Sequence, residues 1–176
     1  MAAVAAVLLP DLDVLFMRRA DYDGDPWSGH VSFPGGRVEA SDASPLAGAM
    51  RETWEELGLS LEDAEVLGEL DPVAPVSGLP SLTIHAFVFS LQRQPDFSLN
   101  REVASVHRWP LEALLADEGR GPMTYRWAGT DHVLPCVDFD GVRLWGLTLR
   151  IVDDLLDRLD GRGIGLDRLA PGRLPV

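Results

Sequence analysis

Lysine is absent from this chain, and all fifteen of its basic residues are arginine. The absence excludes catalysis through a lysine Schiff base and excludes a Walker-type phosphate loop, because both need a lysine ammonium group. Cysteine is almost absent as well. With Cys136 alone no internal disulfide can form, which fits a reducing compartment and predicts a cytoplasmic protein.

Basic charge is scarce beside acidic charge, and long apolar runs are missing. Fifteen basic and 28 acidic residues give a net charge of −13, which argues against nucleic acid or an anionic membrane as partner. The apolar stretch 3–9 is too short to span a membrane and predicts a buried strand. A length of 176 residues with 46% apolar content fits one soluble globular domain.

What the chain does have is a short cluster of carboxylates. Glu52, Glu55 and Glu56 follow Arg51 closely enough that, on a helix, all four share one face within an arc of roughly 140°. Arg51 precedes Glu55 by four residues and is expected to hold that carboxylate in place. Three like charges repel one another, and a divalent cation with oxygen ligands is the agent expected to offset the repulsion.

The helix that carries the cluster is predicted over residues 45–57. Ser44 suits the N-cap, Pro45 the first helical position, and Gly58 the left-handed residue that ends a helix. The side chains expected to pack against the core are Leu46, Met50, Thr53, Trp54 and Leu57.

Two glycines, Gly35 and Gly36, stand after Pro34 and before this helix. They predict a tight loop whose backbone approaches a ligand or a metal closely. The alternative interpretation of the acidic face is a solvated helix surface with one ion pair. The glycine pair and Gly58 make that alternative the less favoured one.

These residues resemble the signature of the Nudix hydrolases, which is a Gly, five residues, a Glu, seven residues, and then R-E-U-x-E-E-x-G-U, where U is bulky and apolar. Residues 51–59 match its second half. Two departures stand out. Thr53 occupies an aliphatic position, and the interval before the helix is one residue longer than usual, so that Asp42 or Glu39 must replace the first Glu.

The longer loop is similar to that of one branch of the family, the coenzyme A pyrophosphatase-like proteins. The resemblance runs from about residue 3 to residue 160. The branch usually has Leu-Arg-x-His-x-Gly-Gln where this chain has residues 24–30, and that segment differs. The matching stretches are Gly29–Gly36, Ala49–Glu52, Glu102–Val103, Trp109–Leu111 and Trp145–Thr148.

The resemblance implies an α/β fold, a Nudix-type α/β/α sandwich with a mixed β-sheet. Alternating strands and helices predict the same class. It implies one Nudix domain over residues 1–160, followed by a C-terminal tail at 161–176 that we expect to be flexible. It also implies hydrolysis of a small-molecule diphosphate with Mg²⁺ or Mn²⁺ as cofactor, coenzyme A being the first candidate, in a monomer or homodimer.

The metal ligands follow from the same resemblance, and the other site residues follow from their positions and charges along the chain. The expected metal ligands are Gly36 through its carbonyl, Glu52, Glu55 and Glu56. The residues expected to act in catalysis are Arg51, Glu52, Glu55 and Glu102, with Glu52 or Glu102 taking the proton from water. The residues expected at the substrate are His30, Gly35 and Arg37.

Two rival functions and one doubt about the substrate stay open. An isopentenyl diphosphate type of isomerase would need a catalytic cysteine with supporting residues that Cys136 lacks. A non-catalytic nucleotide-sensing module would typically lose signature glutamates, which are present here. Asp25 has the wrong sign to bind the 3′-phosphate of coenzyme A. We therefore expect weak coenzyme A cleavage, or preference for a diphosphate without that phosphate, such as a nucleotide sugar or ADP-ribose.

Outside the signature, hydrophobic periodicity and turn residues predict the remaining elements. Residues 117–131, rich in Gly, Asp and Arg, are expected to be irregular. The predicted strands are 3–9, 13–18, 31–38, 64–73, 82–91, 102–109 and 132–138, with a short helix at 111–115 and a last helix at 145–159.

Overall fold

The computed structural model describes residues 1–24, 27–75, 82–127 and 129–160. Within these residues, seven strands form one mixed sheet in the order β3-β2-β1-β6-β5, with β4 beside β1 and β7 beside β2. Strands β1 and β6 run parallel, and the other named pairs run antiparallel. The strands are β1 (Ala2–Leu8), β2 (Asp13–Arg19), β3 (Val31–Ser32), β4 (Gly35–Arg37), β5 (Glu65–Glu69), β6 (Ile84–Ser90) and β7 (Val103–Pro110).

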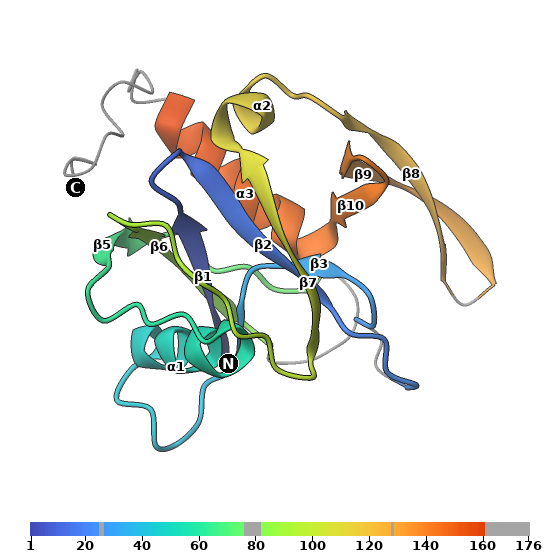
Figure 1. The fold of residues 1–176 in the computed structure, drawn as a ribbon. Helices are drawn as coiled ribbons and strands as arrows, with labels where there is room; N and C mark the ends of the chain where they lie inside the picture. The colour runs from blue at the N-terminus through green and yellow to red at the C-terminus, as the bar shows by residue number, and fades with distance from the viewer. Residues whose placement is uncertain (25–26, 76–81, 128, 161–176) are drawn as a thin grey trace.

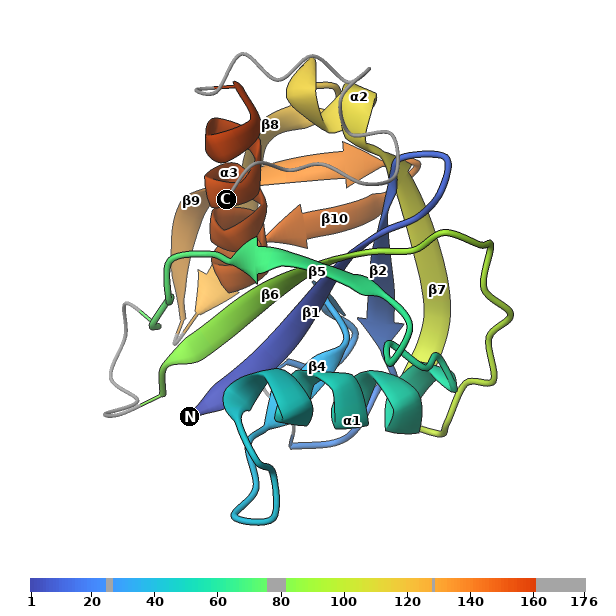
Figure 2. The same ribbon diagram turned by 90° about the vertical axis from the view of Figure 1, so that its left-hand side faces the viewer.

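A helix covers each face of this sheet (Figure 2), α1 (Pro45–Leu57) on one side and α3 (Gly146–Asp160) on the other. The side chains of β2 explain why. Leu15 and Met17 belong to the core under α1, whereas Val14 and Phe16 belong to the core under α3. Successive side chains of a strand point to opposite faces, so a strand that is apolar on both faces needs cover on both. The predicted α/β/α sandwich is confirmed.

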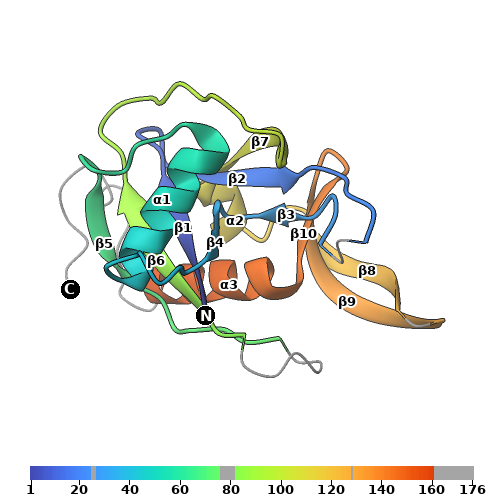
Figure 3. The same ribbon diagram turned by 90° about the horizontal axis from the view of Figure 1, so that it is seen from below.

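A second, three-stranded sheet packs against α3 through Val137 and Leu144, and its far end projects away from the first sheet (Figures 1 and 3). It consists of β8 (Arg120–Trp127), β9 (Thr130–Phe139) and β10 (Val142–Trp145) in the order β10-β9-β8. The short helix α2 (Leu111–Leu115) connects β7 to it. Positive φ angles at Asp140 (52°) and Gly141 (83°) form the tight turn between β9 and β10.

The expectation that residues 117–131 are irregular is therefore wrong, because they contain β8 and the start of β9. Strand β8 pairs with β9 along its whole length, from Arg120 opposite Val137 to Trp127 opposite Thr130. Pro122 breaks the local strand pattern, but it lies opposite Pro135. Since neither proline can donate a hydrogen bond, the pair leaves no donor in this rung unsatisfied.

The three helix predictions were accurate, since the predicted helix 145–159 is α3 (Gly146–Asp160). The limits of the predicted strands were less accurate. Helices 45–57 and 111–115 have the predicted bounds. The predicted strand 31–38 is divided into β3 and β4 around Pro34, and 64–73 shortens to β5. The predicted tail at 161–176 lies outside the described residues. Within the described part of the chain, no helix is long and apolar enough to cross a membrane.

Candidate active site

Helix α1 begins and ends through the contacts that its sequence predicts. The hydroxyl of Ser44 accepts a hydrogen bond from the Ala47 backbone N–H at 3.1 Å, and Gly58 adopts φ 64°. Strand β4 lies beside β1, with Gly36 opposite Ala3 and Gly35 opposite Val4. These contacts fix the helix over the edge of the sheet where the glycine pair runs.

The two glycines allow a close approach that no other residue would permit. At Gly35, where φ is 144°, an added Cβ would collide with the carbonyl oxygen of Ala3 and with Val4. At Gly36, an added Cβ would lie 2.6 Å from the Glu52 carboxylate. The backbone of β4 therefore lies against β1 and the acidic face of α1, and the predicted close approach to a ligand or a metal stays a prediction.

Glu56 is the most deeply buried of the helix carboxylates, with 3% of the residue exposed. Its Oε2 accepts a hydrogen bond from the Gly35 backbone N–H at 2.8 Å. Burial raises the pKa of Glu56 to about 8, although the Gly35 hydrogen bond and the charge of Arg19 act against this, while Glu52 and Glu102 add to it. The charge of Arg19 therefore does not offset the cost of burying the ionised carboxylate.

The charges of Glu52 and Glu102 both act on Glu56. Burial raises the pKa of Glu52; Arg51 opposes the shift, and the charges of Glu55 and Glu102 reinforce it. Glu102 immediately precedes β7 and is held there by its backbone, since its carbonyl accepts from the Ala20 N–H at 2.8 Å. Pairing of β2 with β7 thus brings Glu102 within electrostatic reach of two carboxylates of α1, from fifty residues away in sequence.

Arg51 lies at the centre of a hydrogen-bond network whose main partner is Asp42. Its guanidinium donates twice to Asp42, at 2.9 and 3.1 Å, and once to each of Glu52 at 3.1 Å, Glu55 at 3.2 Å and the Arg37 carbonyl at 3.0 Å. The bond to Arg51 lowers the pKa of Asp42, assisted by the Glu39 N–H. Arg51 contacts Glu55 as expected, but the carboxylate that it binds through two hydrogen bonds is that of Asp42.

One prediction about α1 is wrong. Trp54 was expected in the core, yet it is 58% exposed. The buried stripe of the helix runs through Gly48, Ala49, Thr53, Glu56 and Leu57. Small residues in this stripe let the helix approach the sheet closely, and Trp54, about 100° round the helix from Thr53, is left outside.

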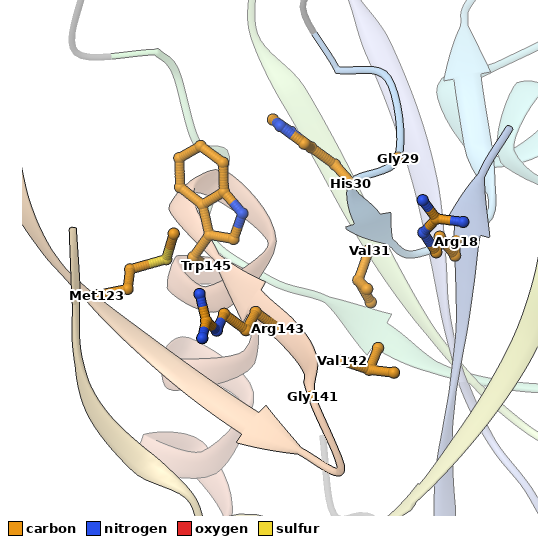
Figure 4. A pocket seen from close by; sticks show the side chains of 9 residues that line it. All are labelled: Arg18, Gly29, His30, Val31, Met123, Gly141, Val142, Arg143 and Trp145. Carbon is orange, nitrogen blue, oxygen red and sulfur yellow. The ribbon is translucent and has the colours of Figure 1, made fainter. Parts of the chain in front are cut away.

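The residues predicted to bind substrate separate into two places. Gly35 and the Arg37 carbonyl belong to the acidic cluster through Glu56 and Arg51. His30 lies elsewhere. Its ring packs edge-on against Trp145, with ring centroids 4.7 Å apart, beside a pocket of about 250 Å³ (Figure 4).

This pocket lies between β2, the chain before β3, and the second sheet, so sequence spacing gave no signal for it. Figure 4 places Arg18 on the β2 side and Arg143 with Trp145 on the opposite side. The residues that line it are Arg18, Gly29, His30, Val31, Met123, Gly141, Val142, Arg143 and Trp145. The segment at residues 25–26, which contains Asp25, lies outside the described residues.

The donor set of the acidic cluster suits a hard cation in chemical type, since it consists of carboxylate and carbonyl oxygens. Within the described ranges, however, no group of three or more His, Cys, Asp or Glu side chains is arranged to hold a metal ion. The guanidinium of Arg51 lies between Glu52 and Glu55 and draws an oxygen of each toward itself. The predicted set of metal ligands stays a prediction.

Comparison with known proteins relates this arrangement to one family. The family model described as NUDIX domain matches residues 1–127. The Nudix hydrolase NudL of Enterobacter sp. (strain 638) is 31% identical over 159 residues, which cover 86% of this chain and 80% of that protein. NudL of Citrobacter koseri is 33% identical over 131 residues, covering 73% of this chain and 66% of that protein.

Solved structures agree in fold across nearly the whole chain. A MutT protein from Methanosarcina mazei Go1 superposes with a TM-score of 0.57 at 20% identity, covering 93% of this chain and 94% of that one. The Nudix hydrolase RenU from M. smegmatis superposes with a TM-score of 0.58 at 18% identity, covering 99% and 89%. At these identities the likeness concerns the fold alone.

Proposed function

This chain belongs to the Nudix family of hydrolases, which act on pyrophosphate bonds and generally use divalent metal ions. From this premise we propose that it cleaves the diphosphate link of coenzyme A or a related nucleoside diphosphate derivative, with Mg²⁺ or Mn²⁺ as cofactor. The single Nudix domain is proposed to span residues 1–160, with the cytoplasm as its compartment.

The observation that carries the proposal is the buried acidic cluster beside the glycine pair. Burial raises the pKa values of Glu56 and Glu52, the charge of Glu102 adds to both shifts, and the charge of Glu52 adds to that of Glu56. Folding has thus brought together carboxylates that repel one another without matching them with enough positive charge. Such an arrangement is unfavourable for stability and is expected where a ligand supplies the missing charge.

The residues that would hold the metal are Glu52, Glu55, Glu56 and the Gly36 carbonyl. When bound, the cation would neutralise the diphosphate and lower the pKa of water. Glu55 is the side chain that must change its contacts for this, because it is about half exposed and its hydrogen bond to Arg51 is 3.2 Å long.

The chain's own groups would divide the remaining work. The Gly35 N–H holds one oxygen of Glu56, which directs the carboxyl toward the cluster. Arg51 is a positioning residue, since it ties the 42-loop to the helix and holds Glu52 beside Gly36. Glu52 or Glu102 would take the proton from the attacking water. The charge of Glu102 acts on Glu52, so the two carboxylates lie in the same region.

Coenzyme A is the first candidate substrate because of the resemblance to the coenzyme A pyrophosphatase-like branch. The resemblance covers the Gly-Gly loop, residues 102–103 and residues 145–148. The structure adds that Trp145 lies beside His30 at the pocket. No observation of the structure favours a non-catalytic nucleotide-sensing module.

The test is hydrolysis of a panel of diphosphates by the full chain. Coenzyme A, 3′-dephospho-coenzyme A, ADP-ribose and a nucleotide sugar would be incubated with Mg²⁺, with Mn²⁺ and with EDTA, and products identified by mass spectrometry. We expect turnover of at least one compound that stops in EDTA. Turnover that persists in EDTA contradicts the metal requirement, and no turnover of any compound with either ion contradicts the proposed activity.

A further inference from the structure

The pocket beside His30 combines two arginines with aromatic side chains, and the acidic cluster does not use it. We propose that it binds a ring system that carries its own phosphate ester, such as a phosphorylated nucleoside, with the phosphate at the guanidinium of Arg143. The inference rests on the proposed function, because the ring and phosphate would belong to the part of the diphosphate substrate that is not attacked.

The aromatic wall of the pocket is fixed by its own packing. The ring of Trp145 lies between His30, with centroids 4.7 Å apart and planes at 63°, and Tyr125, with centroids 4.5 Å apart and planes at 43°. Met123 completes this side of the pocket. Indole and thioether surfaces are apolar and polarisable, and they suit the face or edge of a flat heterocycle.

The guanidinium of Arg143 is held through its Nε, while its two terminal nitrogens are available to a ligand. Its Nε donates to Asp138 at 3.0 Å, and Asp138 is held in turn by the Gly141 N–H at 2.8 Å. In the part of the chain that the structure describes, no protein group accepts a hydrogen bond from its terminal nitrogens. The side chain is 55% exposed. A guanidinium held in this way presents a planar pair of donors to an incoming phosphate.

Arg18 faces the pocket from the opposite side (Figure 4). Its Nη2 donates to the two oxygens of Asp21 at 3.2 and 3.4 Å, and the Asp21 side chain is 70% exposed. Bonds of this length to a solvated carboxylate are weak, so a phosphate can replace them at small cost. Among the described residues, the lining contains these two arginines and no acidic residue, so an anionic ligand is repelled less here than elsewhere on a chain with a net charge of −13.

The pocket connects to the acidic cluster along two neighbouring stretches. Gly29 and His30 lead through β3 to Gly35, which donates to Glu56. Arg18 is followed on β2 by Arg19, whose charge acts on Glu56. The volume of about 250 Å³ lies below the roughly 300–1,000 Å³ of sites that enclose a whole drug-sized ligand. It therefore fits one end of an extended substrate whose diphosphate lies at the cluster.

Binding of two probes by isothermal titration calorimetry tests the inference without any catalytic step. Adenosine 3′,5′-bisphosphate carries the additional phosphate, and adenosine 5′-monophosphate lacks it. We expect the wild-type chain to bind the bisphosphate about tenfold more tightly, the value of one charge-assisted contact. Arg143→Gln should reduce the preference to about twofold or less.

Arg126→Gln is the matched control. Arg126 lies on the same small sheet, is 73% exposed, and has only a 3.8 Å contact with Asp131. Arg126→Gln removes the same charge as Arg143→Gln, but Arg126 does not line the pocket. The preference for the bisphosphate should therefore persist in this variant. Equal binding of the two probes by the wild type, a preference that survives Arg143→Gln, or an equal loss in both variants would each overturn the inference. Melting temperatures verify that both variants are folded.

Hydrolysis separates this inference from the proposed function. If the bisphosphate preference depends on Arg143 but no diphosphate is cleaved, the proposed activity is wrong and the pocket assignment stands. If diphosphates are cleaved but the preference is absent, the pocket assignment is wrong and the activity stands. With both correct, kcat/KM for coenzyme A should exceed that for 3′-dephospho-coenzyme A, the opposite of what Asp25 alone predicts, and Arg143→Gln should remove the difference.

Discussion

Arg18 and Arg19 are neighbours on β2, yet their surroundings differ in charge. The charge of Arg19 acts on Glu56, which shares its region with Glu52 and Glu102. Arg18 lines a pocket in which two arginines are each paired with one exposed or half-exposed aspartate and aromatic rings form a wall. The first region holds more carboxylates than guanidinium groups, and the second presents guanidinium groups to a ligand.

The difference suggests how one strand separates two tasks. Carboxylates that stay buried and under-neutralised are suited to gather a cation, so changes there should alter kcat. Guanidinium groups beside aromatic rings are suited to recognise the rest of a substrate, so changes there should alter affinity. Variants on each side of β2 therefore test whether the two regions are independent.

The largest effect is expected from Glu56→Gln. Glutamine keeps an oxygen that accepts from the Gly35 N–H but removes the negative charge. We expect kcat to fall about a thousandfold in excess Mg²⁺, while affinity for adenosine 5′-monophosphate stays within about twofold. Glu62→Gln, an exposed glutamate beyond the helix, is the control. Turnover within about fivefold of wild type would contradict a role for Glu56 in the reaction.

Stability in EDTA should depend on pH through the same residue. The pKa of Glu56 is raised from 4.5 to about 8 in the folded chain, so between these values the folded state binds more protons than the unfolded state. Its contribution to stability is therefore fully present below about pH 4.5 and is lost as the pH rises to about 8.

Urea denaturation of the wild type and of Glu56→Gln across this range measures the effect. The wild type should lose stability relative to the variant by an amount on the order of a few kcal/mol, and Mg²⁺ should reduce the loss. Arg143→Gln, in the pocket that Arg18 also lines, should leave the change of stability with pH as it is in the wild type. Parallel curves for wild type and Glu56→Gln would show that the carboxyl is not desolvated in this way.

A smaller effect is expected from Arg51→Lys. Lysine cannot form the bidentate contact with Asp42 and at the same time reach Glu52 and Glu55. We expect kcat to fall roughly ten- to a hundredfold while KM stays within about threefold, because the residue positions carboxylates instead of touching substrate.

Asp42→Asn sharpens this prediction, since it breaks the same contact from the other end. The double variant should be little worse than either single one. An effect on KM alone would instead indicate that Arg51 binds a substrate phosphate directly.

Much of the acidic cluster could be predicted because its parts are close in sequence. The helix 45–57 has its own cap, its own proline and its own terminal glycine, and 3.6 residues per turn places the glutamates on one face whatever surrounds them. Two things depended on the surroundings. The contact of Arg51 with Asp42 requires the conformation of a loop, and the burial of Glu56 requires that the sheet lies under that edge of the helix.

The pocket could not be predicted in the same way. Arg18 and Arg143 come to line one pocket only when β8, β9 and β10 form a sheet of their own. Gly121 and Pro122 interrupt the strand pattern of β8, so the sequence predicted no strand there. Strand β8 pairs with the neighbouring β9, but the preference of a segment for a strand depends on the side chains packed around it, whereas the signals of helix 45–57 are local. His30 was chosen because it precedes the Gly-Gly loop, and its packing against Trp145 had no signal in the sequence.

The smallest effect concerns two tryptophans, one in each region. Trp145→Leu removes the indole that lies between His30 and Tyr125, so we expect KM for a nucleotide substrate to rise about fivefold with kcat within about twofold. Trp54→Leu is the control, since this side chain is 58% exposed on the outer side of α1; both constants should stay within about twofold. If Trp145→Leu lowers kcat and leaves KM unchanged, then Trp145 acts through His30 on the chain that leads to Gly35. The two sides of β2 would in that case be mechanically coupled and not independent.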